Sequence, residues 1–145
     1  AFLQPDNTGL QSGFMGAQVT ASALLAEMRT KAIPASIQSI PTNGDNQDVV
    51  TMGTIGARRT AELLELLNNL LAIDALMVAQ AVDLRSQQFP GFATGNAVAE
   101  LLAWVRSRVP KLTNDRPMNR DIAGLTRNIP LPGTLVDEQL AWGFT

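Results

Sequence analysis

Hydrophobic and polar positions along the chain predict a protein built from helices. Between about residues 51 and 86 there is no proline, and the only glycines, Gly53 and Gly56, fall in the first turns. This stretch predicts a helix of roughly 50 Å, because an α-helix rises about 1.5 Å per residue. Segments rich in proline or glycine separate it from shorter helical patterns. The expected order is a loop at 1–11, a helix at about 12–31, a loop at about 32–50, the long helix at about 51–86, helices at about 95–109 and 116–127, and an irregular tail.

The long helix has no single apolar stripe. Leucine, isoleucine, methionine and valine side chains cover nearly its whole circumference between residues 63 and 82. A helix that is apolar on all sides must be surrounded by other elements. The remaining helices are too few and too short to surround it. We therefore expect an all-α, long-helix bundle that is part of a larger helical body or of an obligate oligomer.

Two polar residues are candidates for helix starts. Ser12 is a residue type favoured at N-caps, so the first helix is expected to begin there. Its predicted apolar side includes Met15 and Val19. Asp115 is expected to cap the last helix, which would hold Pro117 in its first turn.

Composition excludes several kinds of chemistry. The chain is 46% hydrophobic and 17% charged, which is typical of a folded domain. Its net charge of −2 gives no electrostatic reason to expect nucleic acid or an anionic membrane as a partner. Cysteine, histidine and tyrosine are all absent, and these residues supply most general bases and nucleophiles. We expect no metal site and no complete reaction centre within these residues.

Membrane insertion and secretion are not indicated either. Polar residues interrupt the most apolar stretch, Leu63 to Val82, too often for a membrane span. The first residues, 1–5, contain neither a basic region nor a long apolar run of the kind found in signal peptides. A cytoplasmic location is the expectation that fits these features.

Several longer motifs resemble one enzyme family. The chain contains SGFMGAQVTA at residues 12–21, SIPTNGDNQDVVTMGT at 39–54, ARR at 57–59, and DRP at 115–117 followed by DIA at 121–123. Over roughly residues 9 to 125, these motifs follow the order and spacing of the aromatic amino acid ammonia-lyases and aminomutases. This family includes the histidine, phenylalanine and tyrosine ammonia-lyases, and the bacterial tyrosine enzymes are the most similar.

The resemblance implies a homotetramer of long helices whose active sites draw on three subunits. It also implies an electrophilic prosthetic group, 4-methylidene-imidazol-5-one (MIO), which forms from an Ala-Ser-Gly tripeptide. No Ala-Ser-Gly occurs in this chain. The chain is thus expected to be the C-terminal portion of such a lyase, with the electrophile, the catalytic tyrosines and a carboxylate-binding arginine in an N-terminal half that acts as its partner. Alone it is expected to be inactive and poorly folded, whether it is a proteolytic fragment or a split subunit.

The resemblance assigns site roles to four residues. Gln47, the catalytic candidate, falls where histidine lyases carry glutamate and the phenylalanine and tyrosine enzymes carry glutamine. Asn43 falls where plant phenylalanine lyases have glutamate and bacterial tyrosine enzymes have asparagine. Asn46 would help to bind the amino and carboxylate groups of the substrate, and Met15 would line the pocket. Neutral amides suit this task because they both donate and accept hydrogen bonds without adding charge.

A structural interpretation competes with each of these roles. The sequence Asn-Gly-Asp-Asn at 43–46 is typical of tight turns, in which such side chains bond to their own backbone. Residue type alone favours core filling for Met15. With the resemblance, site roles are favoured for Asn46 and Gln47, and for Asn43 the turn remains an alternative.

The functional hypothesis is an ammonia-lyase acting on tyrosine or phenylalanine and releasing an arylacrylate. Asn43 together with Gln47 argues against histidine as the substrate. The alternatives are an aromatic amino acid 2,3-aminomutase and a non-catalytic helical scaffold. The intact loop from Asn43 to Thr54 argues against the scaffold, whereas these residues do not separate lyase from aminomutase, or tyrosine from phenylalanine.

Overall fold

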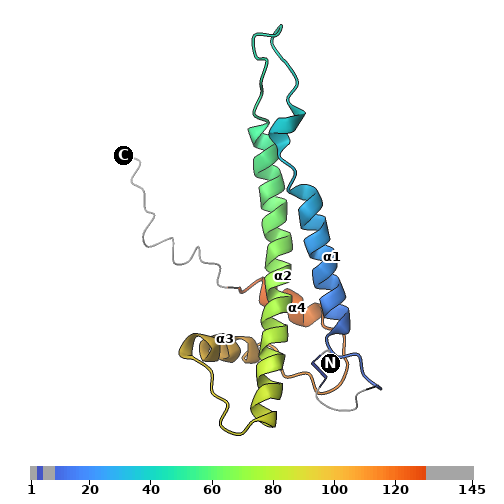
Figure 1. The fold of residues 1–145 in the computed structure, drawn as a ribbon, viewed down its shortest axis with the longest axis vertical. Helices are drawn as coiled ribbons and strands as arrows, with labels where there is room; N and C mark the ends of the chain where they lie inside the picture. The colour runs from blue at the N-terminus through green and yellow to red at the C-terminus, as the bar shows by residue number, and fades with distance from the viewer. Residues whose placement is uncertain (1–2, 5–8, 130–145) are drawn as a thin grey trace.

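The computed structural model describes residues 3–4 and 9–129, and the described part is helical (Figure 1). It has four α-helices, one 3₁₀ helix and no strand, which confirms the expected all-α class. The elements are α1 (Met15–Lys31), η1 (Ala35–Gln38), α2 (Gly53–Gln88), α3 (Asn96–Arg106) and α4 (Asn119–Thr126). The expected tail beyond residue 129 lies outside the described residues.

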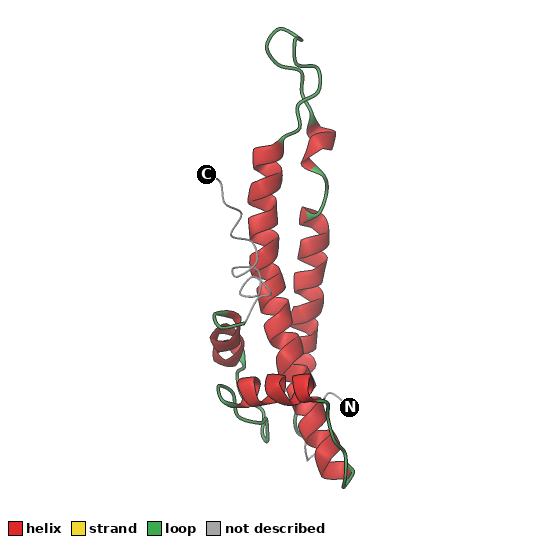
Figure 2. Ribbon diagram, turned by 90° about the vertical axis from the view of Figure 1, so that its left-hand side faces the viewer, coloured by secondary structure: helices red, strands yellow, loops and turns green. Residues whose placement is uncertain are grey.

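The long helix α2 organises the fold. Its 36 residues would span about 54 Å, and α1, η1, α3 and α4 all contact it. Both views show α1 and α2 side by side, with the connection between them projecting beyond their shared end (Figures 1 and 2). Within the described part, no helix is long and apolar enough to cross a membrane.

The buried core lies around the second half of α2. This half contributes Ala72, Ile73, Leu76 and Ala79, whereas no residue between 53 and 71 is buried. The start of α1, the end of α3 with the segment after it, and α4 complete the cluster with Phe14, Ala17, Val105, Val109, Leu112 and Leu125. The three shorter helices are therefore held together mainly through the second half of α2.

Gln80 is a buried polar residue within this core. Its side-chain nitrogen donates to the carbonyl oxygens of Leu112 at 2.9 Å and Leu3 at 3.3 Å. Its side-chain oxygen accepts the Leu112 backbone N–H at 3.1 Å. A buried glutamine is tolerated because its amide is paired with backbone groups that would otherwise lack partners. Gln80 thus ties the segment after α3 to α2.

The structure corrects the predicted face and start of the first helix. The side that packs on α2 repeats every three or four residues and comprises Phe14, Ala17, Ala21, Leu24 and Met28. Met15 and Val19, which were predicted to face inward, are 42% and 59% exposed. Because α1 is apolar on more than one side, the position of α2 decides which side is covered. Ser12 does not cap α1, because the backbone of Gly13 has a φ of +57° and the helix starts only after Phe14.

Two further predictions are wrong in detail. The segment 32–50 is not without regular structure, since residues 35–38 form η1 directly after Pro34. Asp115 does not cap α4, whose N-cap is Met118 without a side-chain hydrogen bond. The Asp115 carboxylate instead binds the backbone before α1, more than 100 residues away in the sequence.

Candidate functional site

Asn43, Asn46 and Gln47 lie together in a hairpin at the tip of the connection between α1 and α2. Thr42 and Gln47 pair as an antiparallel bridge, with N–O distances of 3.0 and 3.3 Å between their backbones. The Thr42 hydroxyl also donates to the side-chain oxygen of Gln47 at 3.2 Å. This pairing holds the backbone and the side chain of Gln47 against the opposite arm of the hairpin.

A left-handed backbone forms the turn between these two residues. Asn43, Gly44 and Asp45 have φ values of +58°, +61° and +65°. The backbone N–H of Asn46 donates to the carbonyl oxygen of Asn43 at 3.3 Å, as in a turn whose two central residues have positive φ. Asparagine, aspartate and glycine tolerate this conformation better than other residues do. Residues 43–46 therefore form the tight turn that their sequence predicts. The same turn brings the three amide residues close together.

Contacts at the base of the hairpin attach it to the helices. The backbone N–H of Val50 donates to the Ser39 hydroxyl at 2.7 Å, which joins the two arms. Arg59 of α2 donates to the carbonyl oxygen of Ile33 at 3.1 Å. Met52 stands in the left-handed region at φ +53° where α2 begins. These contacts set the direction in which the hairpin leaves the helices.

An ion pair joins the C-terminal end of α1 to α2 below the hairpin. Lys31 Nζ lies 2.9 Å from Glu62 Oε2 and 3.7 Å from Glu27 Oε1. The hydrogen bond and the charge of Glu62 raise the pKa of Lys31 above its ordinary value. The same contact lowers the pKa of Glu62. Because both groups are solvent-accessible, the ion pair contributes little to the stability of the fold.

Met15 is far from this hairpin within the same chain. It is the first residue of α1, whereas the hairpin follows the other end of that helix (Figure 1). A 17-residue helix alone separates them by about 25 Å. The described structure therefore brings three of the four candidate residues together and leaves Met15 apart.

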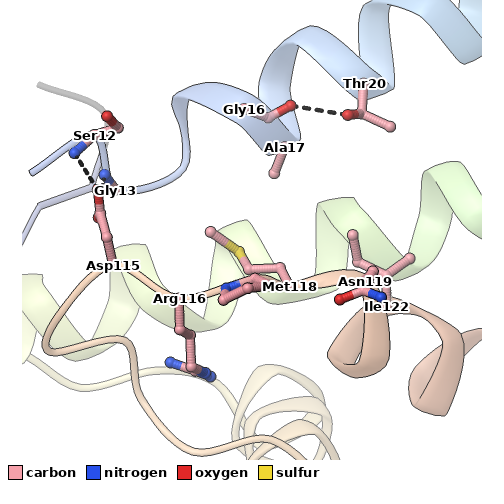
Figure 3. Close-up of a pocket in the computed structure, with 11 residues that line it drawn as sticks. Ser12, Gly13, Gly16, Ala17, Thr20, Asp115, Arg116, Met118, Asn119 and Ile122 are labelled. Atoms are coloured by element: carbon pink, nitrogen blue, oxygen red, sulfur yellow. Dashed lines mark hydrogen bonds between the residues drawn. The ribbon is translucent and has the colours of Figure 1, made fainter.

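A cavity of about 640 Å³ lies beside the start of α1. Small residues of α1 line one wall, and the segment before α4 lines the other (Figure 3). At its edge, the Asp115 carboxylate accepts the backbone N–H groups of Ser12 at 2.6 Å and Gly13 at 2.8 Å. Arg116 turns to a different partner and donates to Asp121 at 2.9 Å. Asp115 is thus the acidic residue that binds the backbone preceding α1.

Sequence reasoning missed two of these partners. Thr42 pairs with Gln47, and the signal for this pairing in the sequence is the run of four turn-forming residues between them. Asp115 was assigned to the nearest helix, and nothing in the local sequence connects it with Ser12. Contacts between residues so far apart in the sequence depend on the tertiary structure and cannot be predicted from local sequence.

The arrangement of the three amides can orient a polar ligand. The hairpin presents three exposed amide side chains, which can donate to a carboxylate and accept from an ammonium group. In the part of the chain that the structure describes, no group of three acidic, histidine or cysteine residues is placed to hold a metal ion. We therefore assign the hairpin a binding and orienting capacity.

Comparisons with known proteins agree with this helical arrangement and with the motifs. The family profile for "Aromatic amino acid lyase" matches residues 1–107. A tyrosine ammonia-lyase from Cupriavidus metallidurans is 48% identical over 125 residues, which covers 86% of this chain and 23% of the relative. An "MIO-dependent tyrosine 2,3-aminomutase" from Streptomyces globisporus is 50% identical over 121 residues, covering 83% of this chain and 22% of the relative.

A solved structure is similar as well. The crystal structure of the tyrosine aminomutase from Streptomyces globisporus superposes with a TM-score of 0.76 at 48% identity. The match covers 87% of this chain and 23% of that chain. This chain therefore spans about a quarter of the length of the relatives that it matches.

Proposed function

Since the chain belongs to the aromatic amino acid lyase family, we propose that it forms part of an ammonia-lyase or aminomutase acting on tyrosine or phenylalanine. The observation that carries this proposal is the hairpin, which brings Asn43, Asn46 and Gln47 together at one turn. In the proposed enzyme, these amides bind the amino and carboxylate groups of the substrate and hold it in one orientation. Gln47 has the central role, because Thr42 restrains its side chain.

The electrophile of such an enzyme has to come from outside these residues. The Streptomyces relative is named as MIO-dependent, and this prosthetic group would supply the electrophile that captures the substrate. The chain contains no Ala-Ser-Gly tripeptide from which the group could form. The group would therefore have to form in another part of the protein, and the roles proposed for the residues described here are binding and orientation of the substrate.

We further propose that the complete site joins more than one copy of the chain. Met15 begins α1 and Gln47 lies in the hairpin beyond the other end of that helix, so the two cannot line one pocket within a single copy. In a homotetramer, Met15 of one copy and the hairpin of another can meet, with the remaining residues supplied by the rest of the enzyme. The apolar residues that are exposed on α1 and α2 would be covered in the same assembly.

The test is an activity assay of the full-length protein with tyrosine, phenylalanine and histidine. A lyase releases ammonia and an arylacrylate from the aromatic substrates, whereas an aminomutase yields the β-amino acid. Intact-mass analysis should show an Ala-Ser-Gly site that is lighter by two waters. A protein with no activity on tyrosine or phenylalanine would contradict the proposal, and activity on histidine alone would contradict its substrate class.

A pair of glutamine variants tests the role of the hairpin. Gln47→Ala should lower kcat/KM by on the order of 100-fold, since it removes an orienting contact at the reacting end of the substrate. Gln38→Ala changes an exposed glutamine in η1 of the same connection and should leave kcat/KM within about twofold. Equal effects of the two substitutions would refute a specific role for Gln47.

A further inference from the structure

The N-terminal end of α1 lacks the features that usually stabilise a helix start. Its N-cap residue, Phe14, makes no side-chain capping hydrogen bond, and the first turn contains no acidic residue. The first N–H groups of a helix and those just before it need acceptors, and negative charge is favourable at this end. For α1, the residues of its own first turn supply neither.

Asp115 brings a negative charge close to this end of α1 and binds the backbone that leads into the helix. Its two carboxylate oxygens accept consecutive backbone N–H groups, those of Ser12 at 2.6 Å and Gly13 at 2.8 Å. Such charge-assisted hydrogen bonds are stronger than those between neutral groups. A second contact runs alongside, in which Gln11 Nε2 donates to Asn114 Oδ1 at 2.9 Å. We call this set of contacts, made by residues 11–13 with Asn114 and Asp115, the α1 clamp.

The clamp acts on the turn that leads into α1. Gly13 is buried and has a φ of +57°, a conformation that glycine adopts at low cost. The backbone N–H of Met15 donates to the carbonyl oxygen of Ser12 at 3.2 Å, so the turn held by the clamp leads directly into α1. A change in the position of residues 12–13 therefore moves Met15, the first residue of the helix.

We propose that Asp115 is a positioning residue for the substrate pocket, because its carboxylate sets the start of α1 and thereby the place of the Met15 side chain. This inference rests on the proposed function, in which Met15 lines that pocket. Asp115 binds the backbone two and three residues before Met15, at Gly13 and Ser12 (Figure 3), so its proposed effect on substrate passes through Met15.

A double-mutant cycle in the full-length enzyme tests this route. Asp115→Asn keeps the shape of the side chain but replaces one acceptor oxygen with a donor, which opposes one of the two backbone N–H groups. It should raise KM for the aromatic substrate on the order of tenfold and change kcat less, since the affected contact is one of substrate binding. In a protein that already carries Met15→Ala, the same substitution should change KM by less than about twofold.

Asp121→Asn is the matched control. Asp121 lies in the first turn of α4, six residues after Asp115, and its replacement breaks the ion pair with Arg116, but its carboxylate does not bind α1 in the described structure. Its effect on KM should be small and should not depend on Met15. If Asp115→Asn destabilises the enzyme too far for assay, Asn114→Ala is the milder variant, since it removes only the contact with Gln11 and should act in the same direction.

Hydrogen exchange provides a readout that does not depend on activity. The amides of Ser12 and Gly13 should exchange faster in Asp115→Asn than in the wild type or in Asp121→Asn. Unchanged exchange would overturn the clamp itself. Faster exchange with additive effects of Asp115→Asn and Met15→Ala on KM would overturn the positioning role while leaving the proposed function intact. A full-length wild-type protein without lyase or aminomutase activity would instead refute the proposed function, and the role of Asp115 with it.

Discussion

The two halves of α2 both contain leucines and other apolar residues, but their surroundings differ. Residues 72–80 include five buried side chains and contact the start of α1, the end of α3 and α4. Residues 53–71 include none, although leucines recur throughout residues 63–71. Leu64 is 50% exposed, whereas Leu125, packed in the core, is fully buried. The difference therefore comes from what packs around each half.

This comparison explains how a chain of such hydrophobicity can leave so much apolar surface open. Burial contributes about 25 cal/mol for each Å² of apolar surface removed from water, so a leucine-rich helix face that stays exposed forgoes a large stabilisation. Large exposed apolar surfaces mark sites of interaction. The second half of α2 is a local core, and the first half together with the hairpin is the part that the proposed assembly would cover.

A matched pair of leucine substitutions should have the largest effect. Leu125→Ala should lower the free energy of unfolding by about 2–5 kcal/mol, because it creates a cavity in the buried cluster. In the full-length protein, Leu64→Ala should cost a similar amount if other elements cover the first half of α2 as proposed. The denaturant midpoint measures both. If Leu64→Ala lowers the free energy of unfolding by less than about 1 kcal/mol, the first half of α2 stays exposed in the full-length protein as well.

Replacing Gln80 tests how much its buried hydrogen bonds contribute to the stability of the core. Gln80→Leu should lower the free energy of unfolding by about 1–3 kcal/mol, since it leaves the backbone N–H and C=O of Leu112 without partners. Gln87→Leu changes an exposed glutamine near the end of the same helix and should be close to neutral. Thermal unfolding of the two variants provides the comparison, and equal Tm values would contradict the role of Gln80.

Two glycine substitutions, one in the hairpin and one in the first half of α2, should change stability in opposite directions. Gly44→Ala forces a Cβ into a backbone with φ +61° and should destabilise the hairpin by about 1 kcal/mol. Gly56→Ala lies in α2, where an added Cβ meets nothing within 4 Å, and should stabilise by roughly 0.5–1 kcal/mol. Hydrogen exchange at Asn46 and Gln47 measures the first effect, and the denaturant midpoint measures the second. Slower exchange in Gly44→Ala would show that the turn does not need this conformation.

The smallest expected effect concerns the ion pair between the two long helices. The lowered pKa of Glu62 means that its contribution to stability is present above its ordinary value of 4.5 and is lost as the pH falls through the lowered pKa. The raised pKa of Lys31 means that its contribution is present below 10.5 and is lost as the pH rises through the raised pKa. Lys31→Met should therefore reduce stability slightly at neutral pH and no longer at strongly acidic pH. A Tm difference between variant and wild type that is the same at both pH values would contradict this account.

Much of the helical order could be predicted from local sequence. The long proline-free stretch indicated a helix at about 51–86, and the structure has it at Gly53–Gln88. Helix ends were less predictable, because they depend on backbone angles such as that of Gly13 and on partners that are distant in sequence. Motifs in the sequence indicate the hairpin residues, and the comparison of Gln47→Ala with Gln38→Ala tests the role proposed for Gln47.

The sequence by itself determined which segments are helical and which residues turn the chain, because proline, glycine and the short amides act on their own backbone. Only the tertiary structure decided which side of α1 is covered, where the Asp115 carboxylate binds, and how Gln80 is buried without loss of its hydrogen bonds. Each of these features needs two segments that lie far apart in the chain. Packing on α2 brings these segments close together in space, and local residue preferences do not determine that packing.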